Sequence, residues 1–194
     1  EALVAHYREE RASPGRELRV GFFGGAPPDD ALIDAIGGLP FGVRVRPDLL
    51  TRARVAELSA RGADAVELDA WTLADAALAD ARRPFRSRLV LQMLAELPTY
   101  GVRPGVVLAP GLPRTDHATA LADARAVAPL VAFARVQPVL VLDGSDLRRA
   151  WLDGTYVPLA LGQAVTTARA VVDVLDEAGV EVVRVGANPV HDGL

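Results

Sequence analysis

Two carboxylates on one predicted strand are the first residues that could do chemistry. Glu67 and Asp69 alternate with apolar residues, so both side chains point to the same side of that strand. Carboxylates this close need a cationic partner or a proton, and Arg44 and Arg46 on the preceding predicted strand could supply it. The pattern fits a site for an amine, a ribose or a cation, with Arg46 and Asp69 as candidate substrate contacts. It fits equally an internal salt bridge that closes the end of a barrel.

A pair of glycines is the second candidate. Gly24 and Gly25 follow the apolar run 18–23 and precede two prolines. Glycines without Cβ atoms let the backbone approach a ligand closely, although a plain tight turn uses them as well. In a chain that alternates strands and helices, this place is the carboxyl end of a parallel sheet, where ligands bind.

Several chemistries lack support in the sequence. The chain has no cysteine, so it can form no disulfide, cysteine–zinc site or cysteine nucleophile of its own. His6, His117 and His191 have no neighbours at metal-ligand spacing, so no metal site is predicted. No catalytic triad, dinucleotide-binding glycine motif or Walker A lysine is present. We therefore assign no catalytic residue from the sequence.

The elements that must position these residues alternate along the chain. Predicted strands are 18–23, 41–46, 63–68, 102–108, 134–142 and 180–185, and predicted helices are 2–11, 29–36, 50–60, 73–81, 88–100, 117–130 and 163–178. Gly62, Gly101 and Gly179 each stand between a predicted helix and a strand, as C-cap glycines do. The alternation predicts an α/β fold with a parallel sheet.

Composition limits the class of protein. The 194 residues are 51% hydrophobic, which predicts one domain over residues 1–194. The net charge is −4 and the arginines form no large patch, so the charge does not favour nucleic acid. No segment has the length of a membrane span or the pattern of a signal peptide, which predicts a cytoplasmic protein with no membrane partner.

Six short motifs, in this order, resemble one known family. They lie at 21–27, 45–50, 66–72, 109–113, 138–159 and 177–186, and they include Phe22-Phe23-Gly24-Gly25 and Pro110-Gly111-Leu112-Pro113. From residue 20 onward the chain resembles the radical S-adenosylmethionine (SAM) superfamily. The nearest branch holds Elongator-like bacterial proteins and the catalytic subunit of the tRNA-modifying Elongator complex.

The resemblance implies a fold and a cofactor. The fold would be a partial (β/α)6 barrel of the TIM type, and the cofactor would be SAM. Gly24 and Gly25 would contact the methionine amino group, and Glu67 and Thr72 would face the ribose and the methionine. Val139, Leu140 and Val141 would flank the adenine. The substrate stays unknown, and RNA is suggested by the branch alone.

Departures from the family leave two hypotheses. Radical SAM enzymes hold a [4Fe–4S] cluster with three cysteines, and this chain has none, so we expect a first strand and a cluster loop upstream of Glu1. Asp69, Ala70 and Trp71 replace a Gly-Val-Gln segment. The chain is either the core of a radical SAM enzyme or a catalytically inactive domain that binds or scaffolds. A barrel without its first strand exposes a sheet edge, which predicts a protein partner that covers it.

Overall fold

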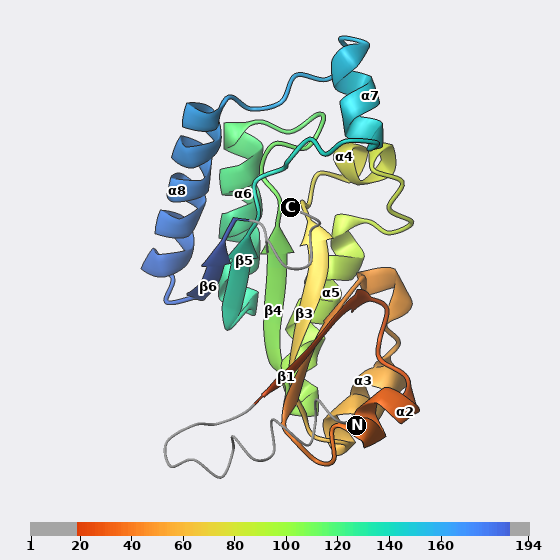
Figure 1. Cartoon of the computed structure of the whole chain (residues 1–194). Coiled ribbons are helices and arrows are strands. Elements are labelled where there is room, and N and C mark those ends of the chain that lie inside the picture. The colour runs from red at the N-terminus through yellow and green to blue at the C-terminus, as the bar shows by residue number, and fades with distance from the viewer. Residues whose placement is uncertain (1–18, 187–194) are drawn as a thin grey trace, which may run out of the picture.

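The computed structural model describes residues 19–186, which form one parallel sheet with helical crossovers (Figure 1). The strands are β1 (Val20–Gly25), β2 (Phe41–Val45), β3 (Ala63–Trp71), β4 (Arg103–Leu108), β5 (Phe133–Val136) and β6 (Glu181–Val185). Their order in the six-stranded sheet is the order of the sequence. The predicted α/β class with parallel strands is confirmed.

The crossovers contain seven α-helices and three short 3-10 helices within the described residues. The α-helices are α2 (Asp30–Ala35), α3 (Arg52–Ala60), α4 (Asp75–Asp80), α5 (Ser87–Glu96), α6 (His117–Val127), α7 (Asp146–Leu152) and α8 (Leu161–Glu177), and the 3-10 helices are η1 (Pro47–Leu49), η2 (Leu97–Tyr100) and η3 (Ala128–Leu130). Side chains of Asp29, Thr51, Asp116 and Ser145 accept hydrogen bonds from the first turns of α2, α3, α6 and α7. These caps fix where the helices begin. No helix in the described part is long and apolar enough to span a membrane.

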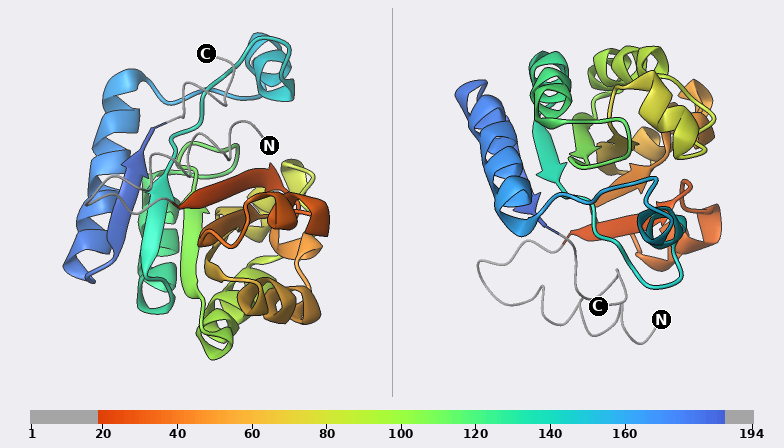
Figure 2. Two further views of the ribbon diagram at one scale, coloured as in Figure 1. Left: turned by 60° about the horizontal axis from the view of Figure 1, so that its bottom comes forward. Right: turned by 90° about the horizontal axis from the view of Figure 1, so that it is seen from above.

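The curved sheet has two different faces. Helices α3, α5, α6 and α8 lie along its outer side, as the view from above shows (Figure 2). Side chains such as Val43, Val66 and Val106 point to these helices and are buried in the core. Alternate residues point to the opposite side, which we call the inner face, and this face carries Arg44 and Glu67. The strand period of two thus separates core from candidate site.

The structure differs most from the prediction at two strands and at one helix. The strand predicted at 134–142 ends at Val136, because the chain then turns and Val139 N donates to Pro110 O at 2.9 Å. Helix α7, which was not predicted, stands above the carboxyl ends of the strands (Figure 1). Strand β3 is longer than predicted and reaches Trp71 through an irregularity in its pairing with β4. The helix predicted at 2–11 lies outside the described residues.

Candidate functional site

Asp69 is the centre of a polar cluster at the carboxyl end of β3. Arg44 Nη2 donates to Asp69 Oδ1 at 2.7 Å, and the same guanidinium group reaches the Gln137 side-chain oxygen at 3.0 Å. Trp71 Nε1 also donates to Asp69 Oδ1, at 3.0 Å, and Arg83 lies 3.4 Å from Oδ2. The predicted pairing of Arg44 with this pair of carboxylates is therefore present, with Asp69 as the partner.

Trp71 has an unusual backbone conformation in this cluster. Its φ of 69° lies in the left-handed region, which bulky residues rarely adopt. The guanidinium carbon of Arg83 lies 3.3 Å from the centroid of its ring, in stacking position. Burial lowers the pKa of Arg83, and the nearby Asp69 carboxylate opposes that shift. Backbone strain of this kind persists only where the surroundings enforce it, which marks the end of β3 as a specialised place.

Glu67 lies one inward position earlier on β3 and has a different partner. Its carboxylate accepts from Arg135 Nε at 2.7 and 3.0 Å, and the side chain is 5% exposed. Burial raises the pKa of Glu67, and the charges of Arg135 and Arg44 oppose the rise. Sequence reasoning missed Arg135 as this partner. Its position on β5, two residues before the polar Gln137, was the available signal.

Arg46 does not join the two carboxylates on β3. Its guanidinium group instead forms an ion pair with Asp48, with Nη2 and Oδ2 2.6 Å apart. That hydrogen bond raises the pKa of Arg46. Of the two arginines that could have paired with these carboxylates, Arg46 therefore pairs with Asp48 instead, and the nearby charge of Asp69 adds only a smaller rise in its pKa.

The two glycines lie beside Arg46 at the carboxyl end of β1. Gly25 has φ +73°, and its carbonyl oxygen accepts from Arg46 N at 2.7 Å. A Cβ on Gly24 would meet nothing closer than the Ala26 carbonyl oxygen at 4.0 Å. The backbone at Gly24 is therefore open to a ligand. The left-handed conformation of Gly25 also agrees with the alternative interpretation of the two glycines as part of a tight turn.

The remaining predicted cofactor residues lie on other segments. Thr72 is 1% exposed, and its hydroxyl donates to Asp123 Oδ2 on α6 at 2.5 Å. Burial raises the pKa of Asp123, and the Thr72 hydrogen bond opposes the rise. Val139 is hydrogen bonded to the loop after β4, and Leu140 beside it is 47% exposed. The structure thus brings Glu67 and Asp69 together on the inner face, whereas Thr72 is directed at α6.

The donor set limits which cofactors this chain can hold by itself. Among residues 19–186 no group of three or more His, Asp and Glu side chains could hold a metal ion. The sequence contains no cysteine, so the chain supplies no thiolate to an iron–sulfur cluster. Open glycine backbone and carboxylates, in contrast, suit an amino group and ribose hydroxyls.

Comparisons with known proteins identify similar folds. No protein-family model and no curated protein matches the sequence. The archaeal Methanocaldococcus infernus Elp3 matches with a TM-score of 0.76 and 15% identity, over 95% of this chain and 54% of that one. Escherichia coli coproporphyrinogen III oxidase (HemN), described as a radical SAM enzyme, matches with a TM-score of 0.66 and 14% identity over 83% and 40%. Streptococcus suis SuiB, bound to S-adenosylmethionine, matches with a TM-score of 0.65 and 12% identity over 96% and 43%. The chain spans about half the length of these proteins or less.

Proposed function

We propose that this chain, which has the partial-barrel fold of the radical SAM proteins, binds SAM at the carboxyl end of its sheet. In this proposal an iron–sulfur cluster is held by residues outside the chain. The observation that carries the proposal is the open backbone at Gly24, next to Gly25 at the end of β1. In open parallel sheets, ligands bind at this edge.

Each proposed contact has a physical role. An ammonium group donates hydrogen bonds, so the methionine end of SAM suits the carbonyl oxygens near Gly24. The Glu67 carboxyl group can accept hydrogen bonds from ribose hydroxyls, and its ion pair with Arg135 opposes the rise in its pKa that burial causes. The segment Val139–Val141 offers apolar surface to the adenine. Thr72 would act through the start of the β3–α4 loop, which its bond to Asp123 anchors.

Radical chemistry itself would come from the cofactors. In the family that the chain resembles, SAM bound beside a reduced [4Fe–4S] cluster supplies a radical that removes hydrogen from a substrate. This chain has no ligand for the cluster, so none of its residues is given a part in radical formation. Its residues hold and orient SAM and shape the space next to it.

Calorimetric titration of the full-length protein with SAM tests the proposal. We expect micromolar binding, and Gly24→Val should weaken it about tenfold or more because the new side chain fills the backbone approach. Gly162→Val on α8 is the matched control, since a side chain there also meets nothing within 4 Å. Undetectable binding by the folded wild-type protein would reject the proposal, as would equal affinity of the two variants.

A second candidate is a catalytically inactive domain that binds or scaffolds. The cluster of Trp71, Arg83 and Asp69 favours it, because these side chains satisfy one another at the carboxyl end of β3. Such a domain would remain folded and fail to bind SAM. Circular dichroism on the titrated sample separates this outcome from simple unfolding.

A further inference from the structure

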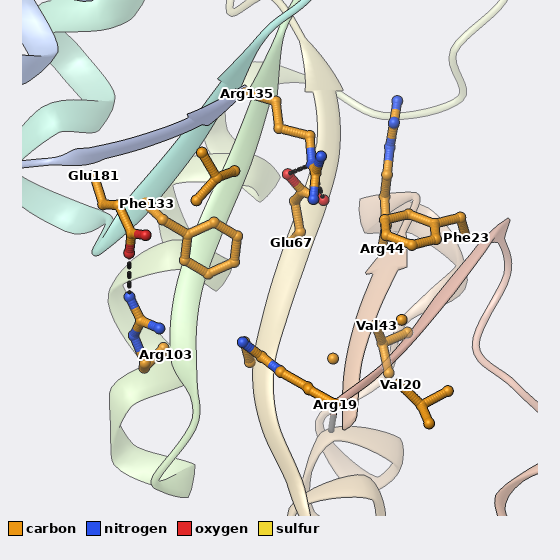
Figure 3. Close-up of a pocket in the computed structure, with 14 residues that line it drawn as sticks. Arg19, Val20, Phe23, Val43, Arg44, Glu67, Arg103, Phe133, Arg135 and Glu181 are labelled. Carbon is orange, nitrogen blue, oxygen red and sulfur yellow. Dashed lines mark hydrogen bonds and ion pairs between the residues drawn. The ribbon is translucent and has the colours of Figure 1, made fainter. Parts of the chain in front are cut away.

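A cavity opens on the inner face, toward the amino ends of the strands (Figure 3). Its volume is about 350 Å³, within the usual range for small-molecule sites. Residues from β1 to β6 line it, among them Arg19, Phe23, Arg103, Phe133 and Val183. Of the residues proposed for SAM it includes only Glu67.

Small residues explain why this part of the barrel is hollow. Gly21, Gly42 and Ala65 pair in register across β1, β2 and β3, so three neighbouring inner positions carry almost no side chain. Closed barrels fill this layer with branched side chains. Here the Phe23 ring lies over Gly21 and the Arg19 guanidinium group lies over Gly42, and no branched side chain occupies these three positions.

Two aromatic rings lie flat against glycines at the edges of the hollow. A Cβ on Gly21 would come within 2.5 Å of the Phe23 ring, and one on Gly105 would run into the Phe133 ring. Both rings line the cavity, as Figure 3 shows. The guanidinium carbon of Arg135 lies over the Phe23 ring at 5.4 Å from its centroid, and that of Arg103 lies over the Phe133 ring at 5.5 Å. Aromatic surface and cationic donors therefore adjoin on both sides of the cavity, which favours a flat apolar ligand that carries an anion.

The polar lining is mainly cationic. Four arginines and two glutamates line the cavity. Within the described residues, Arg135 forms hydrogen bonds through Nε alone, to Glu67. Among residues 19–186, Arg103 forms hydrogen bonds only through Nη2, which donates to Glu181 at 2.9 Å. Guanidinium N–H groups therefore remain available at the cavity, and paired N–H donors match a carboxylate.

We propose that this cavity binds a small planar aromatic molecule that carries a carboxylate. The rings of Phe23 and Phe133 hold the flat body, and the free donors of Arg135 and Arg103 hold the anion. This site goes beyond the proposed SAM function and does not depend on it. Because nearly all of its lining differs from the SAM residues, each site can fail without the other.

Calorimetry with 2-naphthoate as the probe tests this site in the full chain. We expect millimolar or tighter binding, and Val183→Trp should weaken it about tenfold because the indole fills the cavity. Val185→Trp is the matched control. Val185 lies on the same strand and face, is similarly exposed at 53% against 40%, and does not line the cavity.

Charge and folding are controlled separately. The cation 2-naphthylmethylamine should not bind, and Arg103→Gln should weaken naphthoate severalfold with little effect on folding, since Arg103 is half exposed. If Val183→Trp does not fold, Arg103→Gln decides. Equal affinity for the cation and the anion, or no binding of naphthoate, would overturn the proposal.

Discussion

At the scale of single residues, burial controls two carboxyl groups of the barrel wall. Glu67 faces the inner side and Asp123 faces the layer between sheet and α6, and burial raises the pKa of both. Glu67 has Arg135 as a countercharge, whereas Asp123 has the neutral hydroxyl of Thr72. Asp123 is therefore the group whose ionisation most directly opposes folding.

Asp123→Asn should change how stability depends on pH. The folded pKa of Asp123 lies above its ordinary value of 3.8, so the folded state binds more protons in the interval between the two. The free energy of unfolding therefore falls as pH rises through that interval. Asparagine has no proton to lose, so in urea titrations the free energy of unfolding of the variant should rise relative to that of the wild type as pH increases from the ordinary pKa of a carboxyl group to the raised pKa of Asp123.

Asp116→Asn should change the pH dependence of stability in the opposite direction. Thr119 holds the pKa of Asp116 below its usual range, so ionisation of this cap stabilises the fold as pH rises. The free energy of unfolding of this variant should therefore fall relative to that of the wild type as pH rises through the range in which carboxyl groups ionise. The same trend in both variants would contradict the burial argument for Asp123.

Arg135→Ala should destabilise the protein strongly. It leaves the buried Glu67 carboxylate without its ion-pair partner, at a cost of about 2–4 kcal/mol after allowance for the 22% exposure of the Arg135 side chain. Urea unfolding measures this loss of stability. Arg52→Ala removes an exposed pair with Glu96 and should have a much smaller effect.

Part of the polar cluster could be predicted from the sequence and part could not. Strand alternation placed Glu67 and Asp69 on one face and brought Arg44 to the same side. It gave no information on Arg135, which is 68 residues away from Glu67 and reaches it across β4. There Glu67 pairs with Gly105, which has no side chain between the two. The alternation of residues along a strand predicts on which face of the sheet a side chain lies. Which side chain it meets on another strand depends on how the strands are arranged and paired.

At the scale of elements, the strands were predictable because buried parallel strands are short apolar runs. The run after Val136 is equally apolar, yet it carries no strand, since Val139 bonds to the loop after β4 instead. Helix α7 has only seven residues and none of them is buried, so its sequence pattern was too short to predict a helix. Ser145 at its N-cap was the remaining signal.

Gly105 on β4 gives a test of packing at this scale. Gly105→Ala places a methyl group into the Phe133 ring, so we expect about 1–3 kcal/mol of destabilisation. Gly162→Ala on α8 meets nothing and should be neutral or slightly stabilising. Thermal unfolding compares the two. Adding Phe133→Leu to Gly105→Ala should recover part of the loss, and no recovery would contradict steric overlap as the cause.

At the scale of the whole molecule, the described sheet has two edges. β1 pairs only with β2, and β6 only with β5, among the strands of residues 19–186. Free backbone N–H and C=O groups at such edges favour pairing with another chain. The partner predicted from the sequence would cover the edge at β1.

Light scattering over a wide range of protein concentration tests the open edge. We expect the 194-residue chain alone to associate or precipitate as its concentration rises. A stable monomer at every concentration would show that the edge is already protected.

The unbroken strand order bears on how the chain is made. Every strand lies next to its neighbours in sequence, and each new strand joins the sheet at the β6 side. During synthesis from the N-terminus, each βα unit can dock on those already formed without waiting for a distant segment. The strand most recently synthesised is then the unpaired edge of the sheet. A translational pause would therefore expose a different strand, depending on where in the chain it occurs.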